Sequence, residues 1–240
     1  MTRRNLVALS LLASLLSACA GHTELAPDAR RSLESELTGG GRTWFLRESQ
    51  YVTPFFGDAS KRLLTPLPPE DVRLLEDPSG NPITPGPVQT IAPVGSRVRI
   101  LRVEFPTAFS VAERLLVTPR TQPWVYLEVA GVPGDTPLIL VLPSDAKSEA
   151  EFRADLERHL TTVDPVEALA AFSPQVREAV LEKKVVTGMS GEALRMAWGA
   201  PAKIRVDHRD GVRIEDWRFQ GDRRSAVLED GRVVRFNDPD

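Results

Sequence analysis

Nine prolines lie within the forty residues from Pro54 to Pro93. Proline fixes φ and lacks a backbone N–H, so it interrupts helices and the inner strands of sheets. Pro78-Ser79-Gly80-Asn81 is a typical turn sequence inside this stretch. We therefore expect a looping segment here, with neither a long helix nor a central strand.

Short strands are predicted on the C-terminal side of the proline-rich stretch. Hydrophobic residues alternate over 96–105 and 124–129, and a third apolar run covers 138–142. Glycine and proline separate these runs, which is typical of short antiparallel strands. The fold class that we predict is α+β, with a β-rich N-terminal domain over residues 43–143 that forms a small barrel or sandwich.

After Pro143 the apolar residues recur at about every fourth position, which indicates helix. Ser148 and Glu151 have the spacing of a capping box. Asp164-Pro165 places a cap and an N1 proline before a second short helix. We predict a helical connector over residues 144–171.

Two more helices are predicted at the start of the last unit, residues 172–240. Ser173-Pro174 is an N-terminal signal for the first, and Ser190 is the N-cap of the second. Gly199 follows the last helical residue, and Pro201 prevents the helix from continuing.

The rest of this unit has the pattern of a hairpin sheet. Asp210-Gly211 and Asp230-Gly231 stand between apolar runs, and such pairs are the strongest short-range hairpin signal. Three or four strands follow the last helix, with a bulge or a switch of face expected near Glu215. The runs cover residues 203–207, 212–219, 224–229 and 232–236.

The order of these motifs resembles one known family. Val185-Val186-Thr187-Gly188-Met189-Ser190, a short helix, Trp198-Gly199-Ala200-Pro201, Trp217-Arg218-Phe219 and Asp230-Gly231-Arg232-Val233 are similar to the SmpA/OmlA module. That module is the small lipoprotein of the outer-membrane barrel assembly machinery and its relatives. The resemblance implies two helices packed on a three-stranded antiparallel meander, and a role as an assembly or binding subunit. Its signature residues here are Gly188, Met189, Gly199, Pro201, Trp217 and Gly231.

The chain also departs from that family. About 150 further residues precede the module once a signal peptide is removed, and Phe219 stands where the family usually has a tyrosine. The resemblance covers residues 172–237, so it assigns no role to the β-rich part.

The N-terminus has the pattern of a bacterial lipoprotein signal peptide over residues 1–18. Arg3 and Arg4 precede an uncharged, mostly apolar run of 11 residues, Leu6 to Leu16, and a spanning helix needs about 20. Leu16, Ser17 and Ala18 then form a lipobox before Cys19, the one cysteine of the chain. The alternative is an ordinary cleaved signal with a chance cysteine.

From this pattern we expect cleavage before Cys19 and a lipid on its sulfur, which would attach the protein to a membrane. Two or more acyl chains suffice for stable attachment. By resemblance to lipoprotein sorting, Ala20 after the cysteine implies an outer-membrane protein that faces the periplasm. Residues 19–42 are predicted to be a tether, with one short amphipathic helix over Pro27 to Leu37.

Charge and cysteine content limit the partners and the source of stability. Arg3 and Arg4 leave with residues 1–18, so 28 of the 30 Lys and Arg remain against 33 Asp and Glu, a formal net charge of −5. This balance argues against nucleic acid as a partner. Without a second cysteine for a disulfide, a hydrophobic core must stabilise the chain.

Few residues have the pattern of a chemical site. In Gly188-Met189-Ser190-Gly191 the second glycine comes one position too early for the nucleophile elbow G-x-S-x-G, so Ser190 is better explained as a helix cap. His208 sits in a charged hairpin, and neither histidine nor cysteine lies at ligand spacing from it. We predict no catalytic residue, no metal site, no cofactor and no small-molecule substrate.

Two functional classes fit these observations. The first is a lipid-anchored, non-catalytic binding or scaffold protein in envelope or outer-membrane assembly, whose partner is another envelope protein. The second is a cell-wall-binding or hydrolytic envelope enzyme that uses the β-rich N-terminal domain. An enzyme should show a cleft with a pKa-shifted acid, base or nucleophile.

Overall fold

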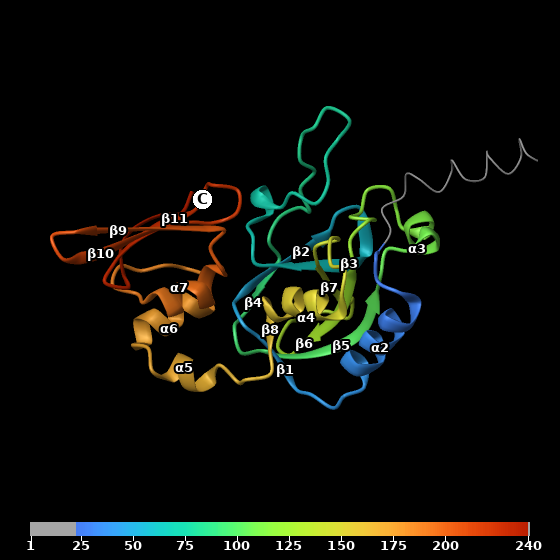
Figure 1. Cartoon of the computed structure of the whole chain (residues 1–240), viewed down its shortest axis with the longest axis horizontal. Helices are drawn as coiled ribbons and strands as arrows, with labels where there is room; N and C mark the ends of the chain where they lie inside the picture. The colour runs from blue at the N-terminus through green and yellow to red at the C-terminus, as the bar shows by residue number, and fades with distance from the viewer. Residues whose placement is uncertain (1–22, 240) are drawn as a thin grey trace, which may run out of the picture.

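The computed structural model describes residues 23–239, an α+β chain with one large mixed sheet and one smaller antiparallel sheet (Figure 1). The helices are α2 (Pro27–Thr38), α3 (Ala108–Glu113), α4 (Glu149–Glu157), α5 (Val166–Ala170), α6 (Pro174–Leu181) and α7 (Gly191–Trp198), with a short 3-10 helix η1 (Pro69–Asp71). None of these described helices is long and apolar enough to cross a membrane.

The large sheet has eight strands in the order β4-β2-β3-β7-β6-β5-β1-β8. All neighbours pair antiparallel except β3 and β7, which are parallel. The strands are β1 (Trp44–Leu46), β2 (Gln50–Phe55), β3 (Asp58–Thr65), β4 (Thr90–Ala92), β5 (Arg97–Glu104), β6 (Trp124–Val129), β7 (Leu138–Val141) and β8 (Leu160–Thr161).

This sheet differs from the small antiparallel barrel or sandwich predicted for residues 43–143. The parallel pair brings together segments far apart in sequence, Arg62–Leu64 and Leu138–Leu140, which local alternation does not reveal. The predicted boundary at 143 is also too early, because β8 adds Leu160 and Thr161 beside β1.

Each face of the large sheet carries a buried core over part of its area. Val125 and Leu127 of β6 point to a core that also contains Leu33 of α2 and Phe152 of α4. Trp124 on the opposite face packs edge-on against Phe55, with ring centroids 4.9 Å apart. Because side chains alternate along a strand, a strand covered on both sides is apolar at nearly every position.

The predicted tether, residues 19–42, is wrong over its helical part. Leu25, Leu33 and Leu37 are buried in the core of the large sheet, and α2 lies against β5 and α4. The spacing of Leu33 and Leu37 places both on one face of the helix, and that face packs onto the sheet instead of leaving the helix in solvent.

The proline-rich stretch holds more regular structure than predicted. β3 occupies Asp58–Thr65, a proline-free interval between Pro54 and Pro66, and it lies inside the sheet. Pro54 itself is the fifth residue of β2, beyond the part of β2 that pairs with β4. The prolines therefore bound the strands, and the irregular path runs from Pro66 to Gln89 with only η1 and one isolated bridge, Glu76 with Pro82.

The predicted helical connector, residues 144–171, is divided between the two sheets. Ser148 caps α4 by accepting a hydrogen bond from the Glu151 N–H, and Phe152 and Leu156 of α4 join the core of the large sheet. Leu169 of α5 belongs to the core of the smaller sheet. The loop between β8 and α5 is the covalent link between the two parts.

The smaller sheet has four strands in chain order, where the family resemblance implied three. They are β9 (Lys203–Arg209), β10 (Val212–Arg218), β11 (Ser225–Glu229) and β12 (Arg232–Asn237). Both predicted tight turns are present, with positive φ at Asp210, Gly211, Asp230 and Gly231, as type I′ turns require. Alternation along β10 is regular, so the bulge expected near Glu215 is absent; a register shift lies at Val227/Leu228 instead.

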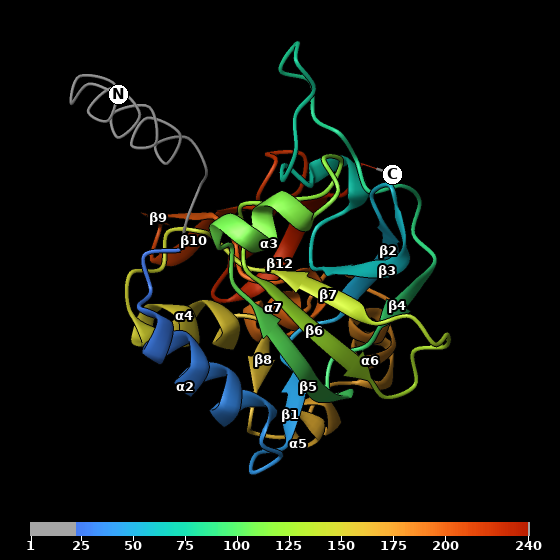
Figure 2. The same cartoon turned by 90° about the vertical axis from the view of Figure 1, so that its right-hand side faces the viewer.

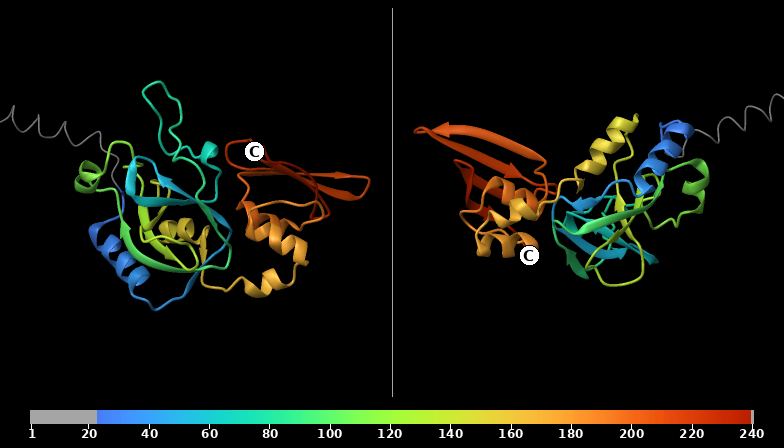
Figure 3. Two further views of the ribbon diagram at one scale, coloured as in Figure 1. Left: turned by 180° about the vertical axis from the view of Figure 1, so that it is seen from behind. Right: turned by 90° about the horizontal axis from the view of Figure 1, so that it is seen from below.

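Helices α6 and α7 cover one face of this sheet and leave the other open. Met189, Leu194, Trp198, Trp217 and Leu228 form the buried layer between them. The β9–β10 hairpin extends past the helices at one end of the long axis, and α3 lies at the other end (Figures 1 and 3). The described chain begins near α3, as Figure 2 shows, and the Thr23 N–H donates to the Pro106 carbonyl at 2.9 Å.

Candidate functional site

The sequence-predicted site residues fall into two groups. Cys19 and the lipobox residues Leu16, Ser17 and Ala18 lie outside the described residues. The six signature residues of the C-terminal unit are described, and they hold its turns and its core.

Gly188 and Gly231 are brought together at the outer edge of β12. Gly188 has φ +86° and donates its N–H to the Val233 carbonyl at 2.7 Å, while the Gly191 N–H donates to the Gly231 carbonyl at 3.1 Å. Positive φ favours glycine at both positions. The segment Gly188–Ser190 therefore covers the first part of the free edge of β12, up to Val233.

Met189 and Trp217 lie in the core beneath α7, buried to 0% and 3% exposure. Trp217 Nε1 donates to Glu215 Oε2 at 3.0 Å, and the Arg195 guanidinium lies over the indole ring at 4.3 Å. Gly199 and Pro201 end α7, as their sequence predicts. These side chains are structural.

Ser190 and His208 are separated by the sheet. Ser190 Oγ accepts a hydrogen bond from the Ala193 N–H at 3.2 Å, which is the geometry of an N-cap. His208 is exposed on β9. Among residues 23–239, histidine, cysteine and carboxylate side chains do not gather in a group that could hold a metal ion.

A buried polar seam joins the two sheets, and Lys183 is its centre. This side chain is 2% exposed, and its Nζ donates to the Ser49 carbonyl at 2.6 Å and the Ala197 carbonyl at 2.8 Å. Burial lowers the pKa of Lys183 to about 7, although the nearby Glu48 carboxylate acts in the opposite direction. An uncharged amine has two N–H groups, which match the two carbonyl acceptors.

Other polar groups extend this seam on both sides. The His159 Nδ1 lies 2.8 Å from Glu48 Oε1, and the Arg224 guanidinium donates to the Tyr51 hydroxyl at 2.8 Å. Burial raises the pKa of Tyr51, which Arg224 opposes. Ser49 Oγ donates to the Val180 carbonyl at 2.8 Å. Because the bonds of Ser49 to Val180 and Lys183, and of Tyr51 to Arg224, cross the junction, the seam acts as a fixed joint between the sheets.

The outer edge of β9 is the most exposed part of the smaller sheet. β9 pairs only with β10 among the described strands, and all seven of its residues are exposed. Ile204 and Val206 are 38% and 45% exposed, although they share a face with Trp217 and Glu215. The helices cover β10 but do not reach this edge.

The open face of the same sheet is strongly charged. Arg205, Asp207 and Arg209 of β9 alternate with Ile204 and Val206. They lie opposite Asp216, Ile214 and Val212 of β10, with hollow space of about 660 Å³ over the face. Charged side chains on an edge strand hinder nonspecific pairing.

The larger hollow lies on the other sheet, between α2 and the β5–β6 strands. It measures about 1100 Å³ and combines apolar walls with Arg42, Arg97 and Arg99. Arg99 pairs with Glu128, and Arg62 on the same rim donates to the Pro133 and Thr136 carbonyls. Its lining has four arginines against Glu128 and Asp135, so the hollow has a net positive charge.

Comparisons of the chain with protein-family models, with curated proteins and with solved structures found no match.

Several residues of these sites give no recognisable signal in the sequence. Lys183 sits in a Lys-Lys pair that looks like a solvated helix end, and only its neighbours in space, Ser49 and Ala197, reveal its burial. No sequence pattern marks Glu48 or Arg224 as a buried polar residue. The apolar run Leu115-Leu116-Val117 can be seen in the sequence, but it fits neither strand nor helix periodicity, so the sequence does not predict whether it is buried.

Proposed function

We propose that this protein is a lipid-anchored outer-membrane lipoprotein that faces the periplasm and acts as a non-catalytic binding or scaffold protein in envelope assembly. The observation that carries the binding role is the contrast between the two edges of the smaller sheet. Gly188–Ser190 covers the first part of the β12 edge, up to Val233, whereas β9 is open along its whole length. An open edge is a template for a strand from another chain.

The backbone of β9 indicates how a partner strand would pair. The hairpin closes at Arg209 and Val212, so the residues that bond β10 alternate with those that point outward. Ile204, Val206 and His208 then direct their N–H and C=O groups away from β10. The His208 N–H already donates to Asp207 Oδ1 at 2.8 Å, so a partner strand would form its backbone hydrogen bonds with Ile204, Val206 and the His208 carbonyl.

The side chains of β9 indicate the chemistry of that partner. On one face, Ile204 and Val206 would be covered by apolar side chains. On the other, Lys203, Arg205 and Arg209 outnumber Asp207, so acidic side chains would be complementary. The occupant that we propose is an extended segment of another envelope protein with apolar residues on one face and acidic residues on the other.

The anchor at Cys19 and the resemblance of residues 172–237 to the SmpA/OmlA module belong to the same proposal. We expect wild-type protein to incorporate labelled palmitate and to fractionate with outer membranes, because the lipobox directs acylation. Cys19→Ala should lose the label and accumulate as unprocessed or released protein. Recovery of this variant as a normally processed, unlabelled membrane protein would contradict the anchor.

The basic hollow on the large sheet supports a second candidate, a cell-wall-binding or hydrolytic envelope enzyme. Arg42 and Arg97 could attract the carboxylates or phosphates of wall polymers. Cleavage of peptidoglycan, peptides or esters by the purified protein, at rates of order one per second or faster, would favour this candidate. Binding to isolated wall that is lost in Arg97→Gln would show a wall-binding role without catalysis.

A further inference from the structure

The segment between β5 and β6 presents apolar side chains to solvent. Phe109 is 72% exposed and Leu116 is 81% exposed, with Leu115 at 50% and Val117 at 46%. We call these four residues the apolar tip. Leu116 and Val117 are the central residues of a turn in which the Thr118 N–H donates to the Leu115 carbonyl at 3.0 Å. Polar residues, glycine and proline usually fill such positions.

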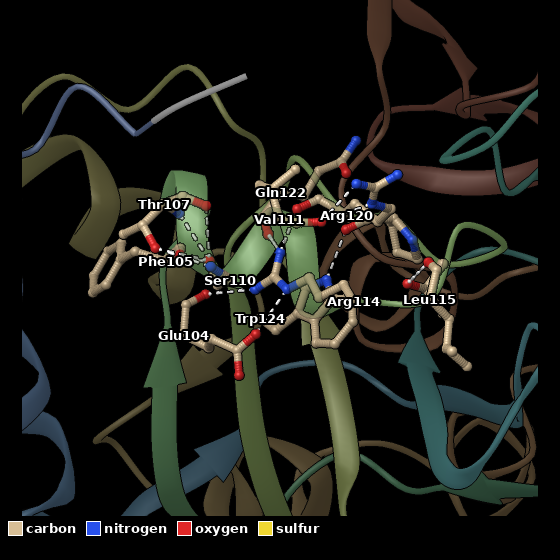
Figure 4. A network of polar contacts seen from close by, with 12 residues as sticks. Glu104, Phe105, Thr107, Ser110, Val111, Arg114, Leu115, Arg120, Gln122 and Trp124 are labelled. Atoms are coloured by element: carbon tan, nitrogen blue, oxygen red, sulfur yellow. Dashed lines mark hydrogen bonds and ion pairs between the residues drawn. The ribbon is translucent and has the colours of Figure 1, made fainter. Parts of the chain in front are cut away.

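A network of hydrogen bonds and ion pairs holds the loop under the apolar tip, as Figure 4 shows. Arg114 is 7% exposed, and its guanidinium donates to Glu104 Oε1 at 2.7 Å and to the Arg120 and Gln122 carbonyls at 2.6 and 2.7 Å. The same guanidinium stacks on the Trp124 ring at 3.8 Å. A buried charge with this many acceptors fixes the path of the loop.

Further contacts fix the two ends of the loop. Arg120 donates through Nε and Nη2 to the Val111 carbonyl at 2.9 and 2.7 Å, and Trp124 Nε1 donates to the Pro119 carbonyl at 2.8 Å. A reciprocal capping box between Thr107 and Ser110 starts α3. In that helix Val111 points inward and Phe109, two residues away, points outward. The exposed apolar side chains therefore stand on a rigid base.

The start of the described chain places this loop close to the proposed anchor. Thr23 is hydrogen-bonded to Pro106, two residues before α3. Cys19 precedes Thr23 by four residues, and four residues span at most about 14 Å when fully extended. A lipid on Cys19 therefore requires the bilayer surface to lie within about that distance of Thr23, at the end of the molecule that carries the tip.

From these observations we infer that the apolar tip inserts into the surface of the bilayer that holds the lipid anchor. This inference rests on the proposed anchor and adds a second, protein-borne contact. Phe, Leu and Val side chains on a rigid loop gain free energy when they move from water to the acyl boundary, which lies about 5 to 10 Å below the interface. With α3 at the membrane, the β9–β10 hairpin at the far end of the long axis points away from it (Figure 1).

The inference is tested with the full lipidated protein in vesicles of phosphatidylethanolamine and phosphatidylglycerol. Lipidation blocks the single cysteine of the chain. An introduced cysteine is then the only thiol that an environment-sensitive fluorophore can label. Leu116→Cys places the probe in the tip. Val163→Cys is the matched control, because Val163 is 75% exposed in the loop before α5.

Brominated lipids should quench the probe at position 116 at least about threefold more strongly than the probe at 163, because only the first reaches the depth of the bromines. Equal, weak quenching in protein that carries the lipid label would overturn the tip contact and leave the anchor intact. Protein that carries no lipid label and does not bind the vesicles would instead contradict the proposed lipid anchor at Cys19. A crosslink from position 116 to an envelope protein, with no quenching by lipid, would overturn the inference in favour of a protein partner.

Discussion

Lys183 places an ionisable group where a charge is costly. In the folded chain its pKa is about 7, against 10.5 for an unperturbed lysine. Between these values the unfolded chain holds the proton and the folded chain has released it, so unfolding takes up a proton and becomes less favourable as pH rises. The free energy of unfolding should therefore increase between pH 7 and about 9, by up to about 1.4 kcal/mol per pH unit.

The check is denaturant unfolding as a function of pH, for wild type and Lys183→Met. Methionine fills a similar volume without a titrating group, so this variant should lose that part of the slope. Lys184→Met is the matched control, because the side chain of Lys184 is 71% exposed and pairs with Glu182. An unchanged slope in Lys183→Met would mean that the buried amine does not titrate in this range.

At the scale of elements, α2 is the largest departure from the sequence prediction, because it packs on the large sheet. Leu33 is fully buried, so Leu33→Ala should lower the free energy of unfolding by about 2 to 5 kcal/mol. Ser35→Ala, at an exposed position of the same helix, should change it by less than about 0.5 kcal/mol. If both substitutions change the free energy of chemical unfolding by similar, small amounts, α2 does not pack on the sheet and the tether prediction is favoured.

Local signals predicted much of the element structure, and contacts between distant segments account for the rest. The caps at Ser148, Ser173 and Ser190 are present because a cap depends on three or four neighbouring residues. Asp210-Gly211 and Asp230-Gly231 form their turns for the same reason. The parallel pairing of β3 with β7 and the packing of α2 depend on partners far along the chain.

The candidate sites divide in the same way. The signature residues were visible as an ordered set, and the structure places them in turns and core. The open edge of β9 required knowledge of which strands pair, and the seam around Lys183 required knowledge of how two sheets meet. The exposure of Leu115–Val117 could be recognised only once the surrounding strands were placed.

At the scale of the whole molecule, the seam makes the two sheets interdependent. The proline-marked boundary at Asp164 predicts a C-terminal unit that folds alone, yet the described unit shares Val94 in its core and takes Ser49 and Tyr51 as polar partners. Residues 164–240 expressed alone should therefore melt at a lower temperature than the full chain, because Lys183 and Arg224 lose these partners. A cooperative melt at the full-chain temperature would show that the seam contributes little.

The same interdependence makes deletion of residues 172–240 a poor test of function, since it would uncover the seam. A single backbone change at the edge of β9 is sharper. Val206→Pro removes an N–H that points away from β10, so the pairing of β9 with β10 should persist while a partner strand loses a bond. Val206→Thr retains the N–H and is the matched control.

The most direct measurement is photo-crosslinking in intact envelopes from a reactive side chain at Arg205, with the same group at Asp135, in the loop between β6 and β7, as a position control. We predict one envelope protein crosslinked at 205 and not at 135. The crosslink should be retained in Val206→Thr and lost in Val206→Pro, with the melting temperature of each variant close to wild type. An undiminished crosslink in a folded Val206→Pro protein would contradict strand addition at β9.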